Sequence, residues 1–216
     1  MVHCFRVAAM ITIYHLSTSR SERIVWLMEE LGLDYELETF AREANGAAPE
    51  AMRNIHPLGR APVIRDGSLV LAESGAIVDY IVHRHGAGRL ALPPTDPAYA
   101  RYLYWLQFAE GSLMTLLLIA LVLSRIPAAN DSPAGARVAA RMKQMLSFVE
   151  GELGSGPFFT GEEFTTADIM MTFPFTTMRR FLDYDLAPLP NIVAYLKRVE
   201  ARPAYRKAMT LAGPEE

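Results

Sequence analysis

A cluster of hydroxyl and charged residues directly precedes the first helical pattern of the chain. Ser19-Arg20-Ser21-Glu22 stands where apolar residues begin to recur at helical spacing, and Arg23 follows. A helix N-terminus carries partial positive charge and free N–H groups, so it attracts anions. A hydroxyl in the loop before it can donate a hydrogen bond to a bound thiolate or carboxylate. This spacing therefore fits an anion site, with Arg20 and Arg23 adding positive charge.

The same residues also match a helix capping box, in which a Ser side chain and a Glu three residues on satisfy free backbone N–H groups. Hydroxyl caps are common. Ser19 and Glu22 can therefore serve the helix alone, with the two arginines on a solvated face, and the sequence leaves both interpretations open. Thr165-Thr166-Ala167-Asp168 is a second capping box, which we interpret only as the start of a helix.

Composition excludes several classes of function. The 216 residues include 21 Lys and Arg against 24 Asp and Glu, a net charge of −3, whereas nucleic-acid-binding domains usually carry a basic patch or stripe. The single cysteine, Cys4, cannot form an internal disulfide, a CxxC pair or a zinc knuckle, and it is typical of a reducing compartment. His83 and His85 are two residues apart at a predicted helix end and do not share a face, so we expect no metal site.

The longest apolar run, residues 113–123, is interrupted only by Thr115. It falls well short of the roughly 20 residues that cross a bilayer, so we expect a buried core helix and no membrane span. The N-terminus is a poor signal peptide because Thr12 and His15 interrupt its apolar stretch early. Together with the cysteine content, this predicts a cytoplasmic protein.

The first part of the chain alternates strand and helix patterns. Residues 11–16 form a short apolar run, suited to the middle of a sheet. A helical pattern from Ser21 ends at Gly32, where a C-cap glycine belongs, and residues 35–40 alternate as a half-exposed strand does. Two further apolar runs flank Asp66-Gly67, a strong hairpin signal. A helix over residues 74–83 follows, giving the order strand, helix, three strands, helix.

Beyond a segment rich in glycine and proline, the chain changes to helical patterns over residues 99–124, 134–153, 166–181 and 191–208. The sequence therefore predicts a mixed-sheet α/β domain followed by an all-α helical domain. We place the first domain at 10–86, a linker at 87–97 and the second domain at 98–212. Residues 1–9 are expected to be an N-terminal extension.

Several strings together resemble the glutathione S-transferase family, in particular soluble bacterial and fungal members. They are Asn54 to Ile64 (NIHPLGRAPVI), Leu71 to Ile77 (LAESGAI), the Ser19-x-x-x-Arg23 spacing, Tyr104-Trp105 with Glu110-Gly111-Ser112-Leu113, and Thr165 to Asp168. The likeness extends from residue 10 to about residue 210. It implies a thioredoxin-like N-terminal domain, a helical C-terminal domain, glutathione as co-substrate without a metal, and a homodimer.

The resemblance also assigns glutathione contacts. Ala61 offers its backbone to the cysteinyl part, Pro62 is a cis-proline, Glu73 faces the ammonium and Ser74 faces the α-carboxylate. Arg60 stands where many members carry Lys and pairs with a glutathione carboxylate, which Arg can do bidentately. The set of glutathione-binding residues implied is Arg20, Arg60, Ala61, Pro62, Glu73 and Ser74.

A free thiol has a pKa of roughly 8.5, so little of it is thiolate at pH 7. A hydroxyl that donates a hydrogen bond is therefore needed to stabilise the glutathione thiolate. A hydrogen bond to a charged group contributes about 1.5–3 kcal/mol, which lowers that pKa by roughly one to two units. Ser19 matches the catalytic serine of serine-type classes. Tyr14 on the first strand is the second choice, and Ser17 and Thr18 lie nearby. Members with a catalytic cysteine carry it in this loop, which has none here.

We expect the electrophile to bind between the domains, against the first long helix. Residues that fit are Tyr102, Trp105, Phe108 and Leu113. An aromatic stripe at helical spacing is also typical of a core or a dimer interface.

The function that the resemblance favours is conjugation of glutathione to small hydrophobic electrophiles, as in detoxification. Two alternatives remain. One is a non-catalytic ligand-binding or regulatory protein of the same fold, since fold does not fix function. The other is a glutathione-dependent peroxidase or isomerase, which the missing loop cysteine disfavours.

Overall fold

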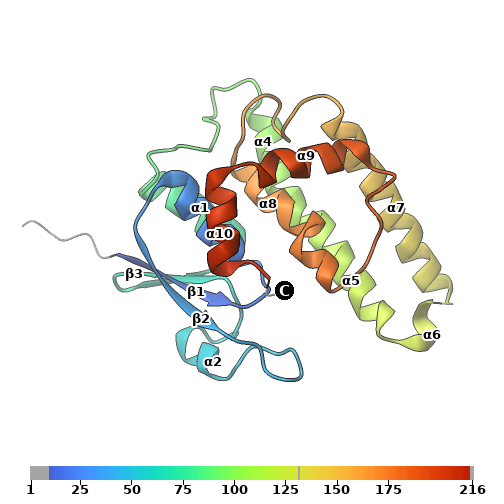
Figure 1. Cartoon of the computed structure of the whole chain (residues 1–216), viewed down its shortest axis with the longest axis horizontal. Helices are drawn as coiled ribbons and strands as arrows, with labels where there is room; N and C mark the ends of the chain where they lie inside the picture. The colour runs from blue at the N-terminus through green and yellow to red at the C-terminus, as the bar shows by residue number, and fades with distance from the viewer. Residues whose placement is uncertain (1–9, 131, 215–216) are drawn as a thin grey trace, which may run out of the picture.

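The computed structural model describes residues 10–130 and 132–214. The predicted extension at residues 1–9, and Cys4 within it, lie outside the described residues. A small sheet with its helices forms one part of the molecule and a bundle of helices forms the other (Figure 1).

The sheet has four strands in the order β2-β1-β3-β4. They are β1 (Ile11–Leu16), β2 (Tyr35–Phe40), β3 (Val63–Asp66) and β4 (Leu69–Ala72). β1 is parallel to β2 and antiparallel to β3, with Ile13 opposite both Leu37 and Ile64. β3 and β4 form the predicted hairpin. Gly67 in its turn has a φ of +59°, a conformation that glycine adopts without steric cost.

Three helices belong to this part: α1 (Glu22–Leu31), α2 (Ala51–Ile55) and α3 (Ser74–Arg84). Ile13, Leu27 and Ile77 are fully buried in one core cluster, so α1 and α3 pack on the sheet through their apolar faces. The short α2 was not predicted, and its Met52 packs with Leu16 and Ala61 in a separate cluster. α1 ends at Gly32 with φ +61°, which confirms the predicted C-cap.

The rest of the chain is helical, and its order confirms the predicted fold class, a thioredoxin-like α/β part followed by an all-α part. The elements are α4 (Tyr99–Phe108), a π-helical turn (Ala109–Met114), α5 (Thr115–Ser124), α6 (Pro127–Asn130), α7 (Pro133–Leu153), α8 (Thr166–Phe175), a 3-10 turn (Thr177–Arg180), α9 (Pro190–Glu200) and α10 (Pro203–Ala212).

Two predicted helices are in fact interrupted. The pattern over 166–181 breaks at Thr176, whose φ and ψ of −115° and −98° are not helical. The pattern over 191–208 is split before Pro203, because proline lacks an N–H and disfavours the helical conformation of the residue before it. The second predicted capping box is confirmed: the Asp168 carboxylate accepts the Thr165 N–H at 2.8 Å.

The helical stretch from Tyr99 to Ser124 spans 26 residues, longer than the predicted apolar run, and its length and composition alone would suffice to cross a membrane. Its Trp105, Leu113 and Leu117 are nevertheless fully buried. They belong to the main core cluster, which also contains residues of α7, α8 and α9. One face of this stretch therefore packs in the core, while Leu118, Ile119 and Val122 are exposed.

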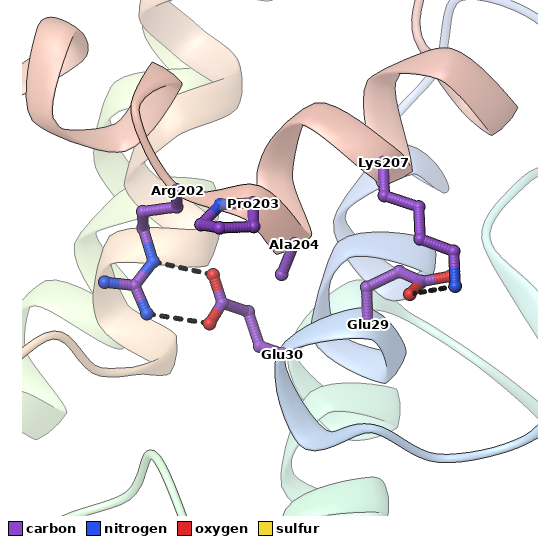
Figure 2. Close-up of a pocket in the computed structure, with 6 residues that line it drawn as sticks. All are labelled: Glu29, Glu30, Arg202, Pro203, Ala204 and Lys207. Atoms are coloured by element: carbon purple, nitrogen blue, oxygen red, sulfur yellow. Dashed lines mark hydrogen bonds and ion pairs between the residues drawn. The ribbon is translucent and has the colours of Figure 1, made fainter.

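The C-terminal helix returns to the first part of the chain and packs against α1 (Figure 1). A pocket of about 460 Å³ lies between the two helices, and Figure 2 shows the ion pairs that line it. The Arg202 guanidinium donates to both carboxylate oxygens of Glu30 at 2.6 and 2.7 Å, and Lys207 pairs with Glu29 at 2.8 Å. These ion pairs join α10 and the residue before it to the C-terminal end of α1.

Candidate active site

The loop between β1 and α1 presents Ser19 to a cleft and does not use it as a helix cap. α1 begins at Glu22, and the Ser19 hydroxyl oxygen accepts the Ser21 N–H at 3.3 Å. The Glu22 carboxyl instead contacts the Thr177 hydroxyl at 2.8 and 2.9 Å. The predicted capping box at Ser19 and Glu22 is therefore wrong, because a buried partner from the helical part takes the carboxyl.

The other candidate hydroxyls of this region lie differently. Thr18 lines the same cleft and has a φ of +54°, uncommon for a residue with a side chain. Its carbonyl and that of Ser17 accept hydrogen bonds from the Arg42 guanidinium, at 3.0 Å each, which fixes the loop. Tyr14 is buried under the Arg65 guanidinium, 5.6 Å from its ring centre. The structure does not place Tyr14 among the residues that line the cleft.

One small cavity brings together all the residues to which the resemblance assigns glutathione contacts. It measures about 100 Å³, and its lining includes Arg20, Arg60, Ala61, Pro62, Glu73 and Ser74. His56 and Leu58 also line it. They stand in the matched string, but no role was assigned to them, and their own residue types carry no signal for one.

The cavity combines charged groups of both signs with the start of a helix. The Ala61–Pro62 peptide bond is cis, as predicted. Glu73 is exposed and has a φ of +75°. Residues with such unfavourable backbone conformations are concentrated at functional sites. Ser74 opens the eleven-residue α3 and is buried, so the positive end of that helix faces the cavity. A zwitterionic ligand with a free carboxylate and an ammonium fits this set.

A three-membered ion cluster ties the site to the helical part. Glu110, on the π-helical turn, accepts from Arg20 at 2.6 Å and from Arg23. Burial by itself would raise the pKa of Glu110, but the two guanidinium groups hold it below its usual value. Arg23 is fully buried and also donates to the Met170 carbonyl at 2.6 Å. The interpretation of both arginines as a solvated face is therefore wrong for Arg23.

A larger cleft of about 590 Å³ adjoins the small cavity and shares Arg20, Leu58, Arg60 and Ala61 with it. Ser19 stands in the lining of this cleft. The helical part contributes an apolar wall to it, made of Met114, Leu118, Leu121, Phe173, Met178 and Phe181.

The four residues predicted for the electrophile do not reach this cleft. Tyr102, Trp105 and Leu113 are buried in the core, Phe108 is 9% exposed, and the cleft lining contains none of them. The Tyr102 hydroxyl is 2.8 Å from that of Thr166, and the Trp105 ring packs 4.8 Å from Phe159. Helical spacing identified a buried face, but that face meets α7 and α8 instead of the cleft.

The titratable groups near the sheet form pairs of their own. His83 lies 3.4 Å from Asp79, and His85 lies 2.8 Å from Asp66, which also accepts from Tyr80 at 2.7 Å. Across residues 10–130 and 132–214, no three His, Cys, Asp or Glu side chains gather where they could hold a metal ion.

The chain resembles glutathione S-transferases in sequence. Residues 9–83 match the family model of the glutathione S-transferase N-terminal domain, and residues 113–203 match that of the C-terminal domain. Glutathione S-transferase 3 of Schizosaccharomyces pombe is 34% identical over 217 residues, which cover 92% of this chain and 86% of that protein.

Solved structures agree with the sequence comparison. A glutathione S-transferase from Actinobacillus pleuropneumoniae is 38% identical, with a TM-score of 0.84 over 95% of this chain and 94% of the other. A sphingomonad glutathione S-transferase solved in complex with glutathione is 25% identical, with a TM-score of 0.75 over 94% and 98% of the two chains. On this evidence, the chain belongs to the glutathione S-transferase family.

Proposed function

We propose that this enzyme binds glutathione in the small cavity, stabilises its thiolate with the Ser19 hydroxyl, and adds the thiolate to a small hydrophobic electrophile in the adjoining cleft. The observation that carries this proposal is the junction of the two spaces. The six residues to which the resemblance assigns glutathione contacts line the cavity. Ser19 lines the cleft, which shares Arg20, Arg60 and Ala61 with that cavity.

Each end of glutathione has a complementary group. The γ-glutamyl carboxylate binds at Ser74 and the start of α3, where the helix dipole favours an anion. The ammonium of the same residue faces Glu73. The cysteinyl backbone pairs with Ala61, and the second carboxylate binds Arg60, whose exposed guanidinium can reach a ligand. Arg20 adds positive charge between the cavity and the cleft.

The thiolate then acts as the nucleophile. Its sulfur forms a bond to the electrophilic carbon, and the electron pair leaves with the displaced group or moves to an acceptor atom of the electrophile. The enzyme contributes thiolate stabilisation and positioning. The apolar wall of the cleft supports a hydrophobic electrophile, and we place its binding on Leu118, Phe173 and Phe181 instead of the buried stripe of α4.

The experiment compares wild type with Ser19→Ala and Tyr14→Phe, and measures the thiol pKa of bound glutathione by thiolate absorbance together with turnover. We expect Ser19→Ala to raise that pKa by about one to two units, and Tyr14→Phe to leave it unchanged. An unshifted pKa and normal turnover in Ser19→Ala would contradict the assignment. If Tyr14→Phe lost turnover and raised the thiol pKa instead, the hydrogen-bond donor would be Tyr14 on β1.

The same assay separates the alternatives. A non-catalytic binding protein would bind glutathione or hydrophobic ligands without turnover, and a peroxidase or isomerase would turn over hydroperoxides or isomerisable substrates.

A homodimer and a cytoplasmic location stay predictions. Exposed apolar residues such as Tyr104 and Phe148, whose rings lie 6.5 Å apart, offer surface for a second copy, and sedimentation measures the dimer.

A further inference from the structure

The Ser19 hydroxyl is the outer end of a buried chain of hydrogen bonds. Ser19 Oγ lies 2.7 Å from Ser21 Oγ, and Ser21 Oγ lies 2.8 Å from His15 Nδ1. Ser19 is 6% exposed, His15 2% and Ser21 0%. The chain thus runs from the cleft, through the start of α1, into the central strand β1.

Two backbone groups limit how this chain can be arranged. The Leu16 N–H donates to Ser21 Oγ at 3.2 Å, and the Ser21 N–H donates to Ser19 Oγ at 3.3 Å. A hydroxyl has one proton to give and two lone pairs to accept with. Each serine therefore has one lone pair already occupied, and the direction of the remaining bonds depends on the ring of His15.

His15 is neutral at pH 7, because burial lowers the pKa of its imidazole to about 4. A neutral imidazole carries its proton on one nitrogen only. With the proton on Nε2, His15 Nδ1 accepts the Ser21 O–H. Ser21 Oγ then accepts from Ser19 to complete the short contact between the serines, so the Ser19 proton is used inside the protein.

The other tautomer has the opposite result. With the proton on Nδ1, His15 donates to Ser21 Oγ, whose lone pairs are then filled by His15 and by the Leu16 N–H. Ser21 must donate its own proton to Ser19 Oγ. Ser19, now accepting from both the hydroxyl and the N–H of Ser21, has its proton free to point into the cleft.

We propose that His15, acting through Ser21, is a positioning residue that directs the Ser19 O–H toward the sulfur of bound glutathione. The inference rests on the proposed function of Ser19. Between the two arrangements Nδ1 takes up a proton and Nε2 releases one to solvent, so the three side chains hold the same number of protons in both. A bound thiolate favours the arrangement in which Nδ1 is protonated, and each hydrogen bond in the series polarises the next. The thiolate is thereby stabilised by three side chains, of which only Ser19 touches it.

The test uses His15→Leu and Ser21→Ala. Each variant removes one hydrogen-bonding side chain behind Ser19, and neither side chain touches the ligand. We expect each to raise the thiol pKa of bound glutathione by about one unit, part of the effect of a full charge-assisted bond. kcat/KM at pH 7 should then fall about tenfold, with KM for glutathione within about twofold. His15→Asn, which can present an amide N–H near the Nδ1 position, should keep the pKa within about half a unit.

Matched controls are His83→Asn and Ser155→Ala, both exposed and distant in the fold, and neither should move the pKa. A second measurement needs no variant. In the wild-type complex with glutathione, above the pKa of its thiol, the ¹⁵N shifts of His15 should report a protonated Nδ1.

Three results would overturn the proposal. One is an unchanged thiol pKa in folded His15→Leu and Ser21→Ala when Ser19→Ala raises it, which leaves the proposed function intact. Another is an unprotonated Nδ1 in the glutathione complex. The last is an unchanged thiol pKa of bound glutathione in Ser19→Ala itself. That result would overturn both the assignment of Ser19 as the donor and the proposed role of His15 and Ser21 behind it.

Discussion

Both carboxyl oxygens of Glu22 lie within hydrogen-bond distance of a single atom, the Thr177 hydroxyl oxygen, at 2.9 and 2.8 Å. A hydroxyl has one proton, so it can donate to only one of them at a time. Both contacts are satisfied together when Glu22 is protonated and donates back to Thr177. Burial raises the pKa of Glu22 to about 8, although Thr177 and Arg23 act against the shift. The contact between α1 and the helical part is therefore made by a neutral carboxyl at pH 7.

This pair predicts a specific dependence of stability on pH. Between about pH 4.5, the ordinary pKa, and about pH 8, the folded protein keeps a proton that the unfolded chain releases, so stability falls as pH rises. Glu22→Gln, an uncharged analogue, should remove that part of the slope in denaturant unfolding from pH 5 to 8.5. Glu162→Gln, at an exposed position, should not. Equal slopes in wild type and Glu22→Gln would mean that Glu22 is ionised.

The contact between Arg202 and Glu30 predicts a difference between two basic residues. Arg202 donates twice to the carboxylate, and its guanidinium lies 3.7 Å from the centre of the Phe164 ring. Arg202→Lys keeps the charge but loses the paired geometry and the stacking. We expect a loss of about 1–2 kcal/mol in the free energy of unfolding. The exposed Arg206→Lys should change it by less than about 0.5 kcal/mol, and similar losses in both would refute the assignment.

The apolar wall predicts which helix positions control the electrophile. Leu118 lines the cleft and its neighbour Ile119 does not, although both are exposed. Leu118→Trp should narrow the cleft and lower kcat/KM for a bulky hydrophobic electrophile about tenfold, a change of about 1.4 kcal/mol, with KM for glutathione unchanged. Ile119→Trp is the matched control. The wall is misplaced if both variants behave alike in steady-state assays with two electrophiles of different size.

The charged residues that line the cleft are all arginines: Arg20, Arg42, Arg53, Arg60 and Arg125. Arg125 at the end of α5 is exposed. Arg125→Gln should raise KM about 1.4- to fivefold for an electrophile that carries a carboxylate, since an exposed charge interaction contributes about 0.2–1 kcal/mol. A neutral electrophile of similar shape should be unaffected, and added salt should remove the difference. Equal effects on both electrophiles would show that Arg125 does not act by charge.

That Ala61-Pro62 and Glu73-Ser74 line one cavity could be expected from the resemblance, because each pair belongs to a short string that is local in sequence. The pairs stand just before a strand and at the start of a helix. Their contacts with glutathione stay a prediction. The succession of strands and helices along residues 11–83 and the hairpin at Asp66-Gly67 followed from short-range patterns, whereas the order of the strands within the sheet was not predicted. No pattern in the sequence indicated that His15 meets Ser21.

The electrophile side could not be predicted, because it depends on how distant helices meet. Periodicity marks Trp105 as buried but does not say whether it faces α8 or a cleft. Likewise, the Ser19-Arg20-Ser21-Glu22 string has the spacing of a capping box, and only the position of Thr177, far along the chain, shows why Glu22 does not close it. Long-range contacts of this kind leave no local pattern.

The π-helical turn at Ala109–Met114 sets the rotational phase of everything that follows it on the same helix. Each residue of an α-helix advances about 100° around the axis, so deleting one residue from the turn would rotate α5 by that angle relative to α4. Leu118 and Leu121 would then turn away from the cleft, while Glu110, at the start of the turn, would stay with α4. A single widened turn thus keeps the apolar wall of the cleft in register with α4, and the shape of that wall is sensitive to the length of the turn as well as to the residues within it.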